Sequence, residues 1–179
     1  METEGGFSDS PADHGGATKY GISLRYLAQQ RKLSPGPIDR FDINHDGVID
    51  APDIADLTLA QAHAIYHDYF WPPASQLPEP LDAAVFDQIV NDGLSAGAKL
   101  LQVSLNTLRR ADNLRVDGDL GPRTRAALTA TVAAVGVRRV LGEFQVQAIA
   151  RYRAIAAYDP SQRGNLNGWL NRAAELGNV

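Results

Sequence analysis

The apolar residues of this chain recur every three or four positions along most of its length, and this spacing constrains the fold more than any other feature. It predicts helices over residues 24–33, 58–70, 81–92, 95–108, 122–135, 137–158 and 166–176. No long segment alternates between apolar and polar residues, and the only strand pairing expected is a short one near Ile43 or Val48. The sequence therefore predicts a mainly α fold.

The composition is that of an ordinary globular protein, with 44% hydrophobic and 21% charged residues in a chain of 179. The chain has no cysteine, which excludes disulfides and thiolate chemistry, so any metal ion must be held by oxygen or histidine ligands. No segment approaches the roughly 20 apolar residues of a membrane span, and the first residues do not have the pattern of a signal peptide. We therefore expect a cytoplasmic protein unless other machinery exports it.

The charges are unevenly distributed along the chain. Residues 1–99 carry six Lys and Arg against fifteen Asp and Glu, whereas residues 100–179 carry eleven Arg against six acids. This asymmetry indicates a cation as partner of the first part and an anionic polymer as partner of the second. Scattered arginines on a solvated face would explain the second excess equally well.

Residues 42–53 have the pattern of a twelve-position calcium loop. Oxygen-bearing groups fall at positions 1, 3, 5, 7, 9 and 12, and Gly47 falls at the sharp turn at position 6. The ligands expected are Asp42, Asn44, Asp46, the Val48 carbonyl, Asp50 and Asp53. The alternative is an acidic turn without a cation, in which the crowded carboxylates would repel one another.

This loop ends in Asp53 where calcium sensors usually carry Glu, and in this respect it resembles the loops of dockerin modules and other extracellular calcium sites. Sensors generally pair two loops and expose a Met-rich groove. Here one loop matches, and the chain has a single Met. We therefore expect a structural Ca²⁺ ion and no cofactor for chemistry.

The segment of residues 4–23 holds five glycines and several titratable groups before a predicted helix. Glycoside hydrolysis needs a proton donor and usually a second carboxylate, and Glu4 and Asp13 supply such a pair. Their spacing, followed by Thr18, resembles the catalytic Glu, Asp and Thr of phage-type lysozymes, although the interval before Thr18 is one residue short. By itself this spacing is common, and an acid so near a terminus would otherwise be a frayed surface group.

The longer run from Glu4 to Ser23 resembles the signature of glycoside hydrolase family 108 muramidases, in which Glu-Gly-Gly-Phe is followed by Asp, two glycines, Thr and Gly-Ile. The family pattern also fits residues 69–71, 86–93, 101–102, 117–124 and 169–172. The resemblance implies a muramidase catalytic region over residues 1–94, with the calcium loop inserted at 39–56. It implies a helical peptidoglycan-binding region over 95–179, packed into the same globule.

The resemblance implies a single lysozyme-like helical unit that cleaves the β-1,4 bond between N-acetylmuramic acid and N-acetylglucosamine. Glu4 would be the general acid, Asp13 would place water or stabilise charge, and Thr18 would help hold the water. Four further residues would contact the substrate: Tyr20 and Trp71 by stacking on sugars, and Asp87 and Asn91 in the wall of the cleft. For the last pair, a satisfied core hydrogen bond is the structural alternative, because these two polar residues lie four apart on an apolar helix.

The partner implied is bacterial peptidoglycan, with neither nucleic acid nor a membrane span involved, and the protein is expected to be a monomer. A phage or prophage endolysin that waits in the cytoplasm and reaches the periplasmic cell wall after release fits this pattern, and a wall-remodelling enzyme encoded by the host is the alternative. Two other functions remain open. A lytic transglycosylase would use Glu4 alone and yield 1,6-anhydro products, and a non-catalytic, calcium-stabilised module would only bind the cell wall.

Overall fold

The computed structural model describes residues 6–9, 16–33, 41–110 and 114–176. The chain forms two compact units, residues 1–68 and residues 69–179. The division falls 26 residues before the boundary predicted between residues 94 and 95, inside a short helical segment, so the predicted domain limits stay a prediction.

The first unit contains a small antiparallel hairpin of β1 (Thr18–Lys19) and β2 (Ile22–Ser23), in which Thr18 pairs with Ser23. Helix α1 (Leu24–Leu33) follows directly. The strand pairing expected near Ile43 or Val48 is wrong, because residues 41–50 form turns whose backbone N–H groups are bound by side-chain carboxylates. Because these backbone N–H groups already donate to side chains, they do not form the backbone hydrogen bonds of a strand pair.

Two short helices complete the regular structure of this unit, α2 (Ala51–Asp56) and α3 (Leu59–Ile65). Each begins with a capping box, formed by Asp50 and Asp53 in α2 and by Thr58 and Gln61 in α3. The fully buried apolar side chains that hold the unit together come from the hairpin, from all three helices and from the link between α2 and α3: Ile22, Leu27, Ile54, Leu57 and Ala62.

The helix predicted over residues 58–70, just before Trp71-Pro72-Pro73, is divided: α3 is followed by a π-helical segment, η2 (Tyr66–Phe70), and then by α4 (Trp71–Ala74). Helix α4 begins at Trp71, so Pro72 and Pro73 both occupy its first turn. First-turn N–H groups have no partner within a helix, and proline lacks one, so the prolines do not end the helix here.

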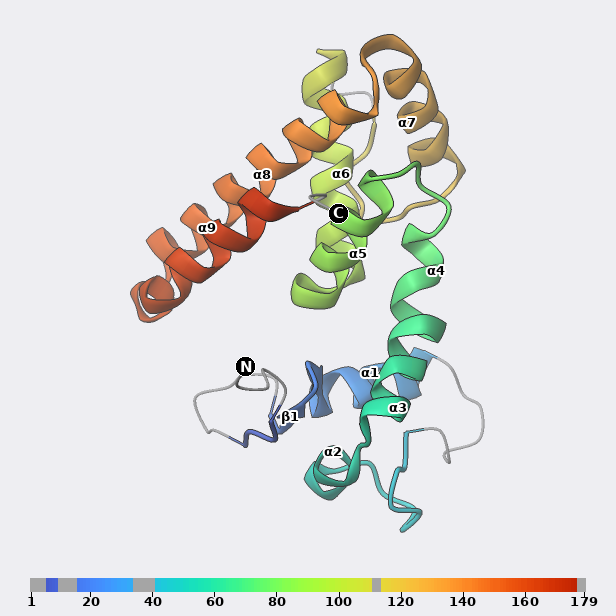
Figure 1. The fold of residues 1–179 in the computed structure, drawn as a ribbon, viewed down its shortest axis with the longest axis vertical. Helices are drawn as coiled ribbons and strands as arrows, with labels where there is room; N and C mark the ends of the chain where they lie inside the picture. The colour runs from blue at the N-terminus through green and yellow to red at the C-terminus, as the bar shows by residue number, and fades with distance from the viewer. Residues whose placement is uncertain (1–5, 10–15, 34–40, 111–113, 177–179) are drawn as a thin grey trace. The chain divides into compact units, whose positions relative to one another are not determined.

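The second unit consists of longer helices (Figure 1). They are α5 (Leu81–Asp92), α6 (Leu94–Arg109), α7 (Pro122–Val135), α8 (Val137–Tyr158), the 3₁₀ segment η3 (Pro160–Asn165) and α9 (Leu166–Glu175). Helix α6 packs against α5 and α8, and α9 packs along α8. Their buried faces carry the predicted apolar stripes, with Leu101, Leu105 and Phe144 fully buried. The prediction of a mainly α fold is confirmed.

Among the described residues, no helix combines the length and the apolar character needed to span a membrane.

Candidate functional site

The two carboxylates predicted to carry the chemistry, Glu4 and Asp13, lie outside the described residues. Thr18, the third residue of the predicted set, lies half-buried in β1. Its backbone exchanges two hydrogen bonds with Ser8, at 2.8 and 2.7 Å, and its hydroxyl donates to the Gly16 carbonyl at 3.2 Å. Ser8, which precedes residues 10–15, is therefore paired with Thr18, which follows them in strand β1.

Tyr20 occupies the turn of the hairpin with a φ of 51°, and the next residue, Gly21, has a φ of 76°. The Tyr66 hydroxyl donates a hydrogen bond of 2.9 Å to the Tyr20 carbonyl. A Cβ atom on Gly21 would lie 2.4 Å from that hydroxyl oxygen, so this position has room only for glycine. Burial raises the pKa of Tyr66, whose hydroxyl is the donor that fixes the turn.

The predicted calcium loop is organised by two buried carboxylates. The Asp53 carboxylate accepts hydrogen bonds from the backbone N–H groups of Ile43 (2.6 Å), Asn44 (3.2 Å) and Asp50 (2.8 Å). The Asp42 carboxylate accepts from the N–H groups of Asp46 and Gly47, at 3.1 and 2.8 Å. Residues 42–50 therefore form a series of turns that the carboxylates at the two ends of the loop hold together.

The chain reverses within this loop through positive φ values at His45 (62°) and Gly47 (91°). The Oδ1 atom of Asp50 is buried and has no hydrogen-bond partner among the described residues. Burial raises the pKa of Asp50, and the negative charges of Asp46, Asp53 and Asp42 raise it further. The ligand residues thus lie close enough to interact, but no three His, Asp or Glu side chains in the described part of the chain are arranged to hold a metal ion. Calcium binding therefore stays a prediction.

The predicted cleft pair of the second unit, Asp87 and Asn91, lies on α5. The Asn91 amide donates to the Asp87 carbonyl at 2.7 Å and to its Oδ2 atom at 3.3 Å. Arg172 of α9 forms an ion pair of 3.2 Å with Asp87 Oδ1. Burial raises the pKa of Asp87, Arg172 opposes that rise, and the charge of Asp92 adds to it. Sequence reasoning missed Arg172, which lies 85 positions from its partner.

The next residue of α5, Gln88, begins a second polar network that faces α8. The Gln88 amide donates to Asp92 Oδ2 at 2.8 Å and to the Tyr152 hydroxyl at 3.0 Å. Asp92 also pairs with Arg151 at 2.8 Å. The ring of Tyr152 stacks on Trp169 with centroids 5.3 Å apart. These contacts fix α5 relative to α8 and α9.

Trp71, predicted to stack on sugar, is half-buried and packs edge-on against Phe86, with ring centroids 5.3 Å apart. Thus Thr18 and Tyr20 belong to the first unit, whereas Trp71, Asp87 and Asn91 belong to the second. The structure brings Asp87 and Asn91 together directly, and the arrangement of the full predicted set stays a prediction.

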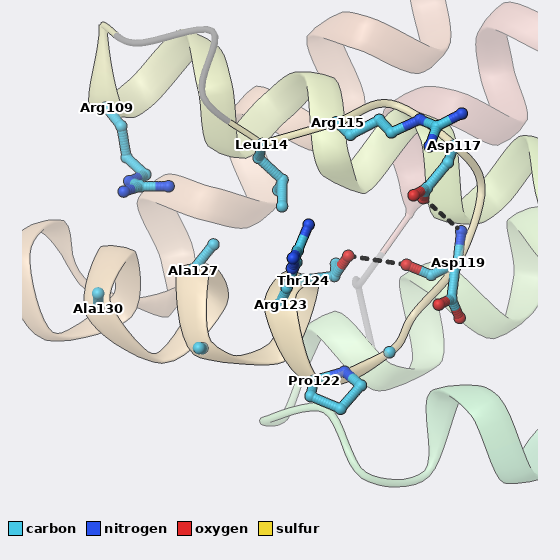
Figure 2. A pocket seen from close by; sticks show the side chains of 12 residues that line it. Arg109, Leu114, Arg115, Asp117, Asp119, Pro122, Arg123, Thr124, Ala127 and Ala130 are labelled. Atoms are coloured by element: carbon cyan, nitrogen blue, oxygen red, sulfur yellow. Dashed lines mark hydrogen bonds between the residues drawn. The ribbon is translucent and has the colours of Figure 1, made fainter.

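The second unit also holds a pocket of about 720 Å³ that sequence reasoning did not predict, between the end of α6, the segment 114–121 and α7 (Figure 2). Gln102, only 1% exposed, braces one side of it. The two N–H groups of its amide are shared among three acceptors, Asp117 Oδ1 (2.8 Å), the Asp119 carbonyl (2.9 Å) and Thr124 Oγ1 (3.0 Å), and its oxygen accepts from the Gly118 N–H (2.9 Å). This one amide joins α6, the loop and the first turn of α7.

The Asp117-Gly118-Asp119 sequence has its own role in this arrangement. The Asp117 carboxylate accepts from Gln102 and from the Asp119 N–H, at 3.0 Å for the latter. The hydrogen bond from Gln102 is the largest cause that lowers the pKa of Asp117. Gly118 has a φ of 83°, and a Cβ there would lie 2.4 Å from Ser95 Oγ. The segment is therefore a turn that hydrogen bonds from Gln102 hold in place.

Comparison with known proteins finds one family in the N-terminal part of the chain and another in the C-terminal part. The family described as Glycosyl hydrolase 108 matches residues 1–93, and the family described as Predicted Peptidoglycan domain matches residues 96–174. Among solved structures, the chain is similar to that described as "Structure of Brucella abortus SagA", with a TM-score of 0.65. The two sequences are 23% identical over 98% of this chain and 90% of that one, so this likeness shows the fold.

No curated protein matches the chain significantly. The resemblance found in the sequence is nevertheless confirmed, because the first family model spans more than half of the 179 residues. The lysozyme-like, mainly α fold agrees with this assignment. The chain belongs to glycosyl hydrolase family 108 and is a glycoside hydrolase that acts on peptidoglycan, with a predicted peptidoglycan domain in its C-terminal part.

Proposed function

We propose that this protein is an N-acetylmuramidase of the lysozyme type, which cleaves the β-1,4 bond between N-acetylmuramic acid and N-acetylglucosamine. The observation that carries the proposal is the family match over residues 1–93, which includes the whole signature from Glu4 to Ser23. The hairpin that ends this signature supports it, because Gly21 and Tyr66 hold the chain in one conformation just after the loop.

In this mechanism Glu4 donates a proton to the oxygen of the leaving sugar. The acid must stay protonated near neutral pH, which requires partial burial, whereas Asp13 must stay ionised to place water or to stabilise the positive ring. Thr18 helps to position the water. Tyr20 and Trp71 offer aromatic faces to the sugar rings, and these two residues are half-buried, so each presents part of its ring.

Asp87 and Asn91 are proposed to line the substrate cleft. Their hydrogen bond and the ion pair of Asp87 with Arg172 hold the two side chains in a fixed orientation. A cleft wall that is already oriented does not lose side-chain entropy when the glycan binds. The same contacts would also be present if Asp87 and Asn91 had only a structural role. The two roles are separated by measuring the KM for glycan in an Asn91→Ala variant, which should rise if Asn91 contacts the substrate.

The catalytic assignment is tested with purified peptidoglycan and a Glu4→Gln variant. We expect hydrolysis to fall by a factor of about 10²–10⁴, because the general acid is lost while the side-chain shape is kept. The Glu2→Gln variant is the control, since it removes a similar charge two residues away. A Glu4→Gln variant that clears peptidoglycan as fast as the parent protein would refute the assignment.

Mass spectrometry of the released fragments tests the reaction type in the same digests. A muramidase adds one water and leaves reducing muramic acid ends. A lytic transglycosylase, with Glu4 as acid and base, leaves 1,6-anhydro ends that are lighter by one water. Predominantly anhydro products would replace our proposal with that alternative, and the absence of any products would favour a wall-binding module without activity.

We also propose that residues 42–53 bind one structural Ca²⁺ ion, through Asp42, Asn44, Asp46, the Val48 carbonyl, Asp50 and Asp53. The sequence pattern supports this site, and so does the buried Asp50 Oδ1 atom, which has no partner among the described residues. A hard cation supplies the positive charge that such an oxygen needs. The ion would hold the loop together and take no part in the chemistry.

A chelator should lower the melting temperature, and added calcium should restore it. At a free calcium concentration of 100 times Kd, the ion adds about 2.7 kcal/mol to the free energy of unfolding. Asp42→Ala with Asp46→Ala should abolish the difference between the two conditions, whereas Glu79→Ala with Asp82→Ala, outside the loop, should keep it. A melting temperature that chelation leaves unchanged would count against the site.

A further inference from the structure

The pocket of the second unit combines charged walls with a small apolar floor. Figure 2 shows the side chains of Arg109, Leu114 and Arg123 pointing toward a common space beside α7. Ala127 and Ala130 of α7 line the same pocket. Because alanine side chains are short, they leave room for a ligand along this helix.

Three arginines and two aspartates line the pocket, so its lining carries an excess of positive charge. Arg109, Arg115 and Arg123 are exposed at its edge, together with the carboxylates of Asp117 and Asp119. Over the described residues, Arg109 and Arg123 form no ion pair or hydrogen bond with another side chain. Two guanidinium groups therefore remain available for an anionic ligand, and Arg is the side chain best suited to carboxylates.

The walls are held rigidly by buried amides of α6. Besides the four hydrogen bonds of Gln102, the Asn106 amide donates to the Leu114 carbonyl at 2.8 Å, and its oxygen accepts from the Leu114 N–H at 3.2 Å. The Thr124 hydroxyl donates to the Asp119 carbonyl at 2.7 Å, as Figure 2 shows. A pocket held in this way is preorganised for binding.

The lining also indicates which part of peptidoglycan would fit. Sugar rings are usually bound against aromatic faces, yet the described residues that line this pocket include no Trp, Tyr or Phe. Peptidoglycan also carries short stem peptides with free carboxylates, amino groups and the methyl groups of alanine. Each of these groups has a chemical counterpart in the pocket.

We propose that this pocket binds the stem peptide of peptidoglycan, with a peptide carboxylate on Arg109 and Arg123 and an alanine methyl group against Leu114, Ala127 and Ala130. A peptide amino group would lie toward Asp117 and Asp119. The proposal deepens the proposed function, because it names the part of the substrate that the C-terminal region recognises. It predicts that the protein is held on the wall by peptides while the glycan is cleaved elsewhere.

The test measures binding of a soluble disaccharide-tetrapeptide by isothermal titration calorimetry, with the peptide-free disaccharide as the second probe. The full chain carries Glu4→Gln in every sample so that neither probe is consumed. Arg109→Gln with Arg123→Gln should weaken binding of the peptide-bearing probe by about tenfold or more, because two charge-assisted hydrogen bonds are lost. Arg138→Gln with Arg139→Gln removes the same charge from exposed positions of α8 and should leave the affinity unchanged.

A second variant fills the pocket without altering its charge. Ala130 is exposed, so Ala130→Trp should preserve the melting temperature and still weaken the peptide-bearing probe. Equal affinity for the two probes would overturn the proposal in favour of sugar recognition. An equal loss of affinity in the Arg138 and Arg139 control would show non-specific charge attraction and overturn the proposal. Undiminished binding of the peptide-bearing probe in both pocket variants would refute it.

These outcomes are independent of the catalytic assignment. With Glu4 restored, the Arg109 and Arg123 variant should still cleave glycan strands from which the peptides have been removed. If the parent protein fails to cleave such strands, the muramidase proposal fails while the binding data stand. If it cleaves them and both pocket variants bind the peptide normally, only the pocket proposal fails.

Discussion

The loop of residues 41–50 in the first unit and the loop of residues 114–121 in the second are fixed by different chemical groups. In the first, the backbone N–H groups are bound by the carboxylates Asp42 and Asp53. In the second, the neutral amides Gln102 and Asn106 reach out from α6 to bind the loop. Carboxylates gathered in one loop repel each other, whereas amides do not. We therefore expect the first loop to depend on a cation and the second to be stable without one.

The largest effect expected is for the Gln102→Met variant. It keeps the shape of a side chain that is 1% exposed but removes four hydrogen bonds, and the Gly118 N–H and Thr124 lose a buried partner. The free energy of unfolding, measured in urea, should fall by about 3 kcal/mol. Gln147→Met breaks only a pair with Glu143 on α8 and should cost less than about 0.5 kcal/mol.

This experiment sharpens the comparison when it is repeated with a chelator. The loss caused by Gln102→Met should be the same with and without calcium, because the amide brace is neutral. A loss that depended on calcium would show that the two loops are not stabilised separately.

A smaller effect is expected from glycines in the two units. Gly21→Ala places a Cβ at a φ of 76° and 2.4 Å from the Tyr66 hydroxyl oxygen, so it should lower the free energy of unfolding by about 2 kcal/mol. Gly142→Ala lies inside α8 with no atom within 4 Å of the added Cβ, and it should raise stability by about 0.5–1 kcal/mol. Equal effects of the two substitutions would contradict the close approach that we describe in the hairpin.

The smallest effect expected is on the pH dependence of stability. The pKa of Asp117 is lower in the folded protein than its ordinary value of 3.8, chiefly because Gln102 donates to the carboxylate. Its contribution is therefore present above pH 3.8 and is lost as the pH falls through the lower, folded value. Asp117→Asn should melt slightly below the parent near pH 6, and the two melting temperatures should converge as the pH falls below the lowered, folded pKa of Asp117. A difference that grows toward acid pH would reverse the sign of the effect.

The helices of the second unit could be predicted from the sequence almost to the residue. The predicted ranges 81–92, 122–135 and 137–158 are those of α5, α7 and α8. A long amphipathic helix repeats its signal over several turns, and glycine or proline marks its ends. The hairpin at 18–23 was missed because strands of two residues contain no measurable alternation.

The residues of the candidate sites also fall into two groups, those that the sequence predicted and those that it could not. Glu4, Asp13 and the loop of residues 42–53 could be named because their signals are local spacings. Arg109 and Arg123 could not, because they lie on different helices and share a pocket only after α6 and α7 have packed. The same holds for Arg172, which meets Asp87 through the packing of α9.

The sequence by itself determined the helical class, the family signature and the candidate carboxylates of the loops at residues 4–23 and 42–53. Each of these features depends on residues that lie close to one another along the chain. The tertiary structure decided which polar residues became partners. Gln102 reads as one polar residue on an apolar helix, yet burial beside Asp117, Asp119 and Thr124 makes it the brace of a pocket. The physical reason is that a buried amide must satisfy its hydrogen bonds, and only packing brings the groups that can do so.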